Sequence, residues 1–206
     1  LDTSLTSKNL TDFYNFGREN IGVNLGFVRE ADPSWRLHGN VMDFGCGVGR
    51  LGSVLAEEDD VDAVVCVDQS VFHLAKAEIH VKKALSPTHA KRFIPLLSSP
   101  DLLLSLQADP AVPRCYDFVH TMIALQHMIT PLQVVYLEQF CDILRPGGKT
   151  FLHIPFLTPT KPACNGATRA TYREEGGMQM HYMTKEDAVA TLTRRGCDVV
   201  LQDRGS

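Results

Sequence analysis

Three glycines and two acidic residues carry the clearest chemical signal in this 206-residue sequence. Asp43, Gly45, Gly47 and Gly49 stand at alternate positions after a run of β-prone residues. Glycine tolerates positive φ and lets a ligand lie against the main chain without meeting a Cβ atom. The amide groups of such a loop, with the N-terminus of the next helix, form a polar cradle for an anionic or hydrogen-bonding ligand. The spacing therefore predicts a ligand-binding turn between a strand and a helix.

The second acid, Asp68, ends the next apolar run. Residues 63–67 read Ala-Val-Val-Cys-Val, which is typical of a parallel strand covered on both faces. An ionised carboxylate at the end of that strand can accept hydrogen bonds from ribose hydroxyls. Together the two motifs predict the nucleotide-binding turn of an open α/β sheet. The alternatives are a glycine-rich turn without a ligand and an acid that serves only the N-terminus of the following helix.

Histidines supply the candidate bases for proton transfer. His127 follows the strand expected at 116–121, His153 lies within the strand expected at 150–156, and His181 ends a long Pro/Gly/Thr-rich stretch. His181 ranks first because it borders the segment that should cover a substrate, with Tyr172 and Tyr182 as orienting groups. Each histidine could equally be an ordinary buried or surface side chain.

Hydrophobic periodicity predicts the elements that must position these residues. The alternation of strands and helices indicates an open α/β sheet. We expect one domain over 1–206, with a helical cap at 1–39 and a substrate-side loop at 157–182. Helices are predicted at 11–29, from 71 (capped by Ser70), at 102–106 (capped by Ser99), 130–144 and from 185 (capped by Thr184). Strands are predicted at 40–44, 63–67, 93–97, 116–121 with a continuation towards 128, 150–156 after a turn at 144–149, and 197–201.

Composition narrows the class of partner. The formal net charge is −4 and no cluster of five Lys or Arg residues occurs, which disfavours binding to nucleic-acid phosphates. The six cysteines contain no C-x-x-C pair and are interpreted as buried thiols of a reducing compartment, neither disulfides nor a zinc site. No signal peptide or apolar run of bilayer-spanning length is visible, so a cytoplasmic location is expected. The chain begins at Leu1 and ends in Gly205–Ser206, so we expect ends that are trimmed or carry added residues.

In the order of its motifs and predicted elements, the chain resembles class I S-adenosylmethionine (SAM) dependent methyltransferases over about residues 40–202. Leu-Arg-Pro-Gly-Gly at 144–148 and Tyr-Asp-Phe-Val at 116–119 are the most telling matches beside the two acidic motifs. The family usually adds an antiparallel strand after the one expected at 197–201, and here that strand would be missing or replaced. The resemblance implies an α/β fold with a Rossmann-like, doubly wound, mainly parallel sheet and helices on both faces, and SAM as the cofactor. No His/Cys/Asp grouping has zinc spacing, so a catalytic metal is not indicated.

The resemblance also implies a role for each site residue. The methionine part of SAM would be surrounded by Asp43, Gly45, Cys46, Gly47 and Gly49. The ribose would meet Asp68 and Gln69, and the adenine Leu97, Ser98 and Ser99. His120, Thr121 and Met122 would lie under the cofactor, and Arg18 would reach the cofactor carboxylate or the substrate.

The predicted function is transfer of a methyl group from SAM to an O or N atom of a small molecule, by a monomer or homodimer. No Asn/Asp-Pro-Pro-aromatic run follows the strand at 116–121, which disfavours methylation of DNA amino groups, and the paired-Glu loop of arginine-methylating enzymes is missing. One alternative is an NAD(P)-binding oxidoreductase using Gly47-x-Gly49-x-x-Gly52, although the sequence has no Tyr-x-x-x-Lys. The other is an inactive partner protein with the same fold.

Overall fold

A computed structural model describes residues 7–156, 170–171 and 180–202. Its centre is a five-stranded sheet in the order β3-β2-β1-β4-β5, in which every pair is parallel. The strands are β1 (Gly39–Phe44), β2 (Val61–Asp68), β3 (Phe93–Leu97), β4 (Tyr116–Thr121) and β5 (Leu144–Leu152). Because β1 pairs with β2 on one side and β4 on the other, the strand order reverses there, and ligands bind at such a switch point.

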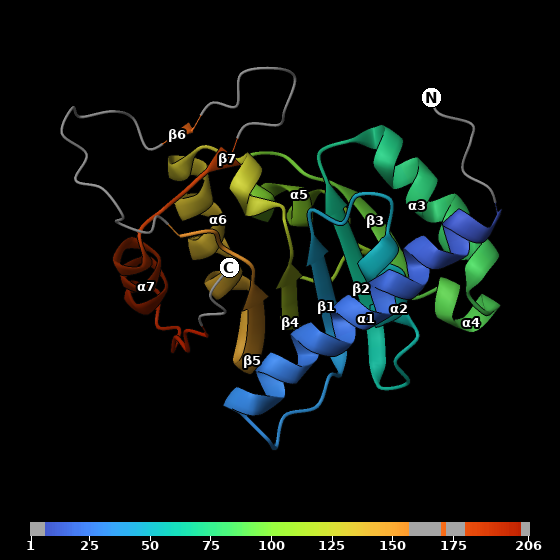
Figure 1. The fold of residues 1–206 in the computed structure, drawn as a ribbon, viewed down its shortest axis with the longest axis horizontal. Coiled ribbons are helices and arrows are strands. Elements are labelled where there is room, and N and C mark those ends of the chain that lie inside the picture. The colour runs from blue at the N-terminus through green and yellow to red at the C-terminus, as the bar shows by residue number, and fades with distance from the viewer. Residues whose placement is uncertain (1–6, 157–169, 172–179, 203–206) are drawn as a thin grey trace.

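Helices cover both faces of this sheet, as predicted (Figure 1). Met42, Val65 and Val119 pack in a core with residues of α5, α6 and α7, whereas Val41 and Val64 pack in a second core with α1 and α2. Neighbouring strand residues thus face opposite sides, which is the period of a strand. The helices are α1 (Ser7–Ala31), α2 (Arg50–Ala56), α3 (Val71–Ala84), α4 (Pro87–Ala90), α5 (Leu102–Ala108), η1 (Leu125–His127), α6 (Thr130–Ile143) and α7 (Lys185–Arg194).

Two of the three predicted helix N-caps are confirmed. Ser70 accepts a hydrogen bond from His73 N and Thr184 accepts one from Asp187 N, as the sequence indicates. The cap of α5 is Asp101, which accepts from Leu104 N, so the prediction of Ser99 is wrong. The Ser99 hydroxyl instead bonds the carbonyl oxygen of Asp101 at 2.6 Å. The predicted cap lies two residues before the observed one, because serine and aspartate are equally good N-caps.

The sheet differs from the prediction at β4 and β5. β4 ends at Thr121, and η1 replaces the continuation expected towards residue 128. The turn expected at 144–149 lies inside β5, where the pairing jumps from Tyr116↔Leu144 to Phe118↔Lys149. Gly147 has φ 82 within that bulge, which explains why glycine stands there.

The strand predicted at 197–201 does not form. Residues 197–202 have no assigned secondary structure and leave α7 towards α1, where the Gln202 amide donates to Phe27 O at 3.2 Å. Among the described residues, no strand follows β5 in the main sheet. Alternating apolar residues favour a strand, but they form one only beside an edge in register.

The cysteine prediction is also wrong. Cys46 in the glycine loop forms a disulfide with Cys66 on β2, and Cys141 on α6 forms one with Cys197 after α7. Cys115 is free and exposed. The pairs are separated by 20 and 56 residues, so only tertiary contact brings them together. The cysteines consequently give no support to a reducing compartment.

The substrate-side loop expected at 157–182 lies mostly outside the described residues. Its described parts are β6 (Ala170–Thr171) and β7 (Met180–His181), which pair antiparallel. Tyr172 falls outside the described residues. No helix in the described part of the chain is long and apolar enough to cross a membrane.

Candidate functional site

The glycine loop between β1 and α2 is held against the end of β2. The N–H groups of Gly45 and Cys46 both donate to Val67 O, at 2.8 and 3.1 Å. Gly45 has φ +74, and a Cβ atom built there would lie 2.2 Å from the Cβ of Ala124. Glycine is therefore required at this position, because the loop after β4 packs directly on the backbone of the glycine loop.

Asp68 lies at the mouth of this loop and is nine-tenths buried, with 9% of its surface exposed. Its Oδ2 accepts from Gly47 N at 2.9 Å, and its Oδ1 accepts from Ser70 N at 2.8 Å. The His73 ring Nδ1 lies 3.3 Å from the same Oδ1. These bonds fix the carboxylate, and Oδ2, which accepts only from Gly47 N, keeps a lone pair for a further donor. Gln69, the next residue, is exposed.

The space beside Gly47 is open. A Cβ atom built on Gly47 would meet nothing within 4 Å, so packing within the protein does not account for a glycine here. Its φ of +56 favours glycine, and its N–H points at Asp68. An open cradle beside a fixed carboxylate fits a ligand that brings hydroxyl groups to Asp68 and lies along the loop backbone.

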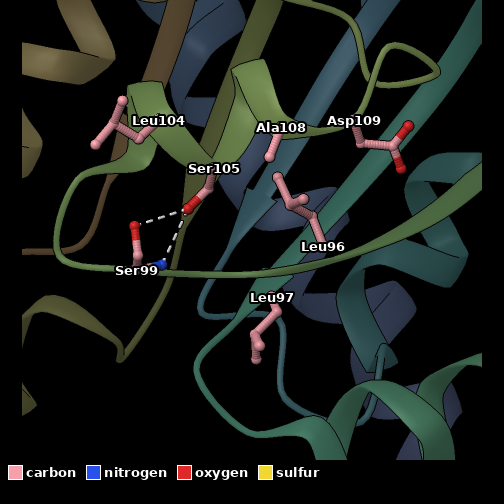
Figure 2. A pocket seen from close by; sticks show the side chains of 7 residues that line it. All are labelled: Leu96, Leu97, Ser99, Leu104, Ser105, Ala108 and Asp109. Atoms are coloured by element: carbon pink, nitrogen blue, oxygen red, sulfur yellow. Dashed lines mark hydrogen bonds between the residues drawn. The ribbon is translucent and has the colours of Figure 1, made fainter.

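The residues expected to border an adenine lie next to Asp68. Leu97 pairs with Asp68 across β3 and β2, and Ser98 N donates to Asp68 O at 2.9 Å. A hollow of about 420 Å³ lies between the end of β3 and α5, and Leu97 and Ser99 are among its lining residues. Figure 2 shows the side chains that line it. The Ser99 hydroxyl lies 2.9 Å from that of Ser105, and the Tyr136 hydroxyl donates to Ser99 O at 2.8 Å. The sequence pattern alone did not reveal Tyr136 as a support of this loop.

Asp43 and His120 are brought together beneath the loop, with Asn24 of α1 as a third member that sequence reasoning missed. All three are buried, with 1%, 0% and 4% exposed. The amide nitrogen of Asn24 lies 3.0 Å from His120 Nε2. Because an amide nitrogen only donates, Nε2 accepts, and the ring carries its proton on Nδ1. Nδ1 then donates to Asp43 Oδ1 at 2.9 Å.

This chain of hydrogen bonds joins α1 to the first residue of the glycine motif. Asp43 Oδ2 is buried and has no hydrogen-bond partner among the described residues. An acid placed in this way orients the loop from below. His120 is fully buried, so its side chain contacts Asn24 and Asp43 and is not open to a ligand in this arrangement.

The loop after β4 is organised by Gln133 of α6, which is 1% exposed. Its amide nitrogen donates to Leu125 O at 2.8 Å, Met128 O at 2.9 Å and His181 O at 3.3 Å. Gln133 thus ties the loop that contains His127 to β7. A glutamine inside an otherwise apolar helical stretch was the one sequence signal for this role.

Of the three candidate bases, His153 follows β5, His127 is the last residue of η1 and His181 is the last residue of β7. His153 N donates to Thr121 O at 3.0 Å, which places it beside the end of β4. His153 is exposed, but partial desolvation by the surrounding protein lowers its pKa below the usual value, so the ring is neutral at pH 7 and its protonated form is disfavoured. His127 Nε2 lies 3.3 Å from the amide nitrogen of Gln126.

Of the remaining predicted site residues, two lie after or at the end of β4 and one lies on α1. Thr121 is fully buried and its hydroxyl has no partner among the described residues, while Met122 Sδ accepts from the Asn24 amide at 3.5 Å. Arg18 forms a two-pronged ion pair with Glu57, which follows the C-terminal end of α2. That pair holds Arg18 at the opposite end of α2 from the glycine loop, so nothing in its placement supports a cofactor role.

The parallel sheet, its switch point and the glycine loop facing an acid at the end of β2 define the Rossmann-like fold of class I methyltransferases. A family model described as "Methyltransferase domain" matches residues 20–203, and the chain belongs to that family. The match includes the C-terminal half of α1, all five strands of the main sheet and α7.

Two solved structures share this fold over most of their length. One is a SAM-bound amino pentose methyltransferase from Micromonospora echinaspora, with a TM-score of 0.60, 16% identity and 88% of this chain and 84% of that chain covered. The other is a glycopeptide N-methyltransferase complexed with SAM, with a TM-score of 0.59, 16% identity and 88% and 85% covered. At this identity, the likeness concerns the fold.

A curated relative matches a shorter segment. The ribosomal RNA large subunit methyltransferase G of Yersinia enterocolitica is 29% identical over 66 residues. The match covers 32% of this chain and only 16% of that protein, so the two share a part of a domain.

Proposed function

We propose that this chain transfers a methyl group from SAM to an O or N atom of a small molecule. The observation that carries the proposal is the Asp68 carboxylate, fixed by two backbone N–H groups at the edge of the open space beside Gly47. Ribose hydroxyls of SAM would donate to Asp68, with Gln69 beside it. The methionine part would lie along Gly45–Gly49, and the adenine would lie near Leu97–Ser99.

Bound SAM supplies an activated methyl group on a sulfonium. The remaining work for the protein is alignment of the acceptor and exclusion of water, which contributes on the order of 7–11 kcal/mol at best. An acceptor that must lose a proton also needs a base, and His181, His127 and His153 are the candidates. The neutral ring of His153 and the attachment of His181 to the loop after β4 are compatible with this role.

A small acceptor is favoured by the charge of the chain. The net charge of −4 and the lack of a basic cluster do not suit a phosphate backbone. The two structural relatives act, by their names, on an amino pentose and a glycopeptide, whereas the ribosomal RNA enzyme matches only a part of this chain.

Calorimetry with SAM, S-adenosylhomocysteine and NADH tests the proposal directly. We expect binding of the first two and none of NADH, and the reverse result would favour the oxidoreductase. Asp68→Ala should weaken SAM binding about tenfold to a hundredfold, because a hydrogen bond to a charged group contributes roughly 1.5–3 kcal/mol. Asp62→Ala is the matched control, since this exposed aspartate lies on the same strand at the amino end.

Unchanged affinity in Asp68→Ala would remove Asp68 from the site. A chain that binds SAM but methylates nothing in a screen of amines and alcohols would be the inactive partner protein.

A further inference from the structure

Ile123 has a backbone conformation that β-branched residues avoid. Its φ is +60, and it is the only residue other than glycine with positive φ in the described part of the chain. Such a conformation costs a β-branched residue stability, and it persists where the surroundings impose it and where function requires the side chain. Ile123 stands two residues after β4, beside the switch point of the sheet.

The surroundings hold Ile123 from both sides. Before it, Thr121 lies in the sheet between Phe44 and Leu152. After it, Ala124 packs on Gly45 so closely that a Cβ there would lie at 2.2 Å, and Gln133 binds Leu125 O at 2.8 Å. The turn therefore has no freedom to relax, and the Ile123 side chain is held at the carboxyl edge of the sheet.

Packing in the core does not offset this backbone strain, because 44% of Ile123 remains exposed. Other large apolar side chains are exposed on segments at the same edge: Phe72 (69%) after β2, Leu97 (49%) at the end of β3 and Ile129 (57%) after η1. The segments that follow the carboxyl ends of the strands are where open α/β sheets bind their ligands, so these side chains are available to a ligand there.

Charge is missing from the loop that carries Ile123. Residues 122–135 contain no Asp, Glu, Lys or Arg, and His127 is their only titratable side chain. A cationic or anionic acceptor would find no counter-ion there, and burying its charge without a partner is costly. The loop is suited to a neutral, apolar group.

We propose that Ile123 is a specificity-determining residue which selects a methyl acceptor that carries an uncharged apolar group near the atom to be methylated. The inference rests on the proposed function, since it takes the methyl donor to lie along the adjacent glycine loop. A polar residue that tolerates positive φ, such as asparagine, would relieve the backbone strain at the expense of this selection.

The test compares Ile123→Asn, Ile123→Val and Ile79→Gln. Valine keeps the β-branch and the apolar surface. Ile79 on α3 is 69% exposed and glutamine preserves its helix, so this variant removes an exposed apolar side chain outside the candidate site. The ligand probe is N-phenyl-1-naphthylamine, which is uncharged, apolar and fluorescent, with saturating S-adenosylhomocysteine present.

We expect Ile123→Asn to raise the melting temperature by about 2–4 °C, which is the shift of a modest gain in stability for a chain of this size. The same variant should bind the probe at least about fivefold more weakly, because it loses part of the contact of a buried aliphatic side chain. Ile123→Val and Ile79→Gln should bind it like the unmodified chain.

The proposal is overturned if Ile123→Asn lowers the melting temperature, which would make Ile123 a packing residue. It is also overturned if the unmodified chain does not bind the probe, or if Ile79→Gln abolishes binding and Ile123→Asn leaves it intact. Calorimetry with S-adenosylhomocysteine alone separates these results from a failure of the proposed function, since Ile123→Asn should bind it normally.

Discussion

His120→Leu tests the buried hydrogen-bond chain that joins α1 to the glycine motif. The substitution removes the donor to Asp43 Oδ1, and Asp43 Oδ2 already has no partner among the described residues. A carboxylate that is 1% exposed would then keep neither hydrogen bond nor water. Removing one partner of a buried pair typically costs about 3–5 kcal/mol, which is a large share of the roughly 5–15 kcal/mol that stabilises a domain.

Asn24→Leu should be milder. It leaves only the neutral acceptor His120 Nε2 without its donor, which costs about 1–3 kcal/mol. His38→Leu is the matched control: its side chain is 57% exposed and lies 4.0 Å from Asp117, so the loss should stay below about 1 kcal/mol.

Urea denaturation followed by circular dichroism measures these losses. The double variant His120→Leu/Asp43→Leu should recover most of the loss, because replacing both partners by apolar groups leaves no buried group unsatisfied. The reasoning fails if His120→Leu costs less than about 1 kcal/mol, or if the double variant is as unstable as the sum of the two single variants.

Three further outcomes are expected. Burial acts to raise the pKa of Asp117, but the hydrogen bonds from Asn40 N and Arg145 outweigh it and hold the pKa below its usual value. The ionised carboxylate therefore stabilises the folded chain above about pH 4, and this stabilisation is lost as the pH falls further. Asp117→Asn should consequently flatten the acid limb of a plot of stability against pH. His181→Ala should lower turnover at least about tenfold with little change in SAM affinity, and normal turnover would move the role of base to His127 or His153. Iodoacetamide added to the unfolded, unreduced chain should label Cys115 and spare the four disulfide cysteines, as mass spectrometry of peptides would show; labelling of Cys46 without reductant would contradict the pairing.

Local sequence signals predicted most of the elements. β3 was predicted with the observed bounds, because it is an apolar run that ends at polar residues. The start of β4 was predicted correctly at Tyr116, but its expected continuation towards residue 128 was wrong. The strand-turn-helix at Asp43–Gly49 followed from glycine spacing, and the cap at Thr184 followed from its hydroxyl and the acids after it. These features depend on residues that are neighbours along the chain.

The errors involve contacts between distant segments. The disulfide Cys46–Cys66 needs the register of β1 against β2, and the strand expected at 197–201 needs an edge to pair with. Ser99 and Asp101 are equally good caps, and the path of the chain after β3 decides between them.

The candidate site divides in the same way. By itself the sequence determined the glycine loop and Asp68, because steric freedom at glycine and the charge of a carboxylate are properties of single residues. Only the tertiary structure decided that Asn24 and His120 support Asp43, that Gln133 holds the loop after β4, and that Ile123 is strained and exposed. Those roles arise from pairing and packing between segments far apart in sequence, which no local pattern encodes.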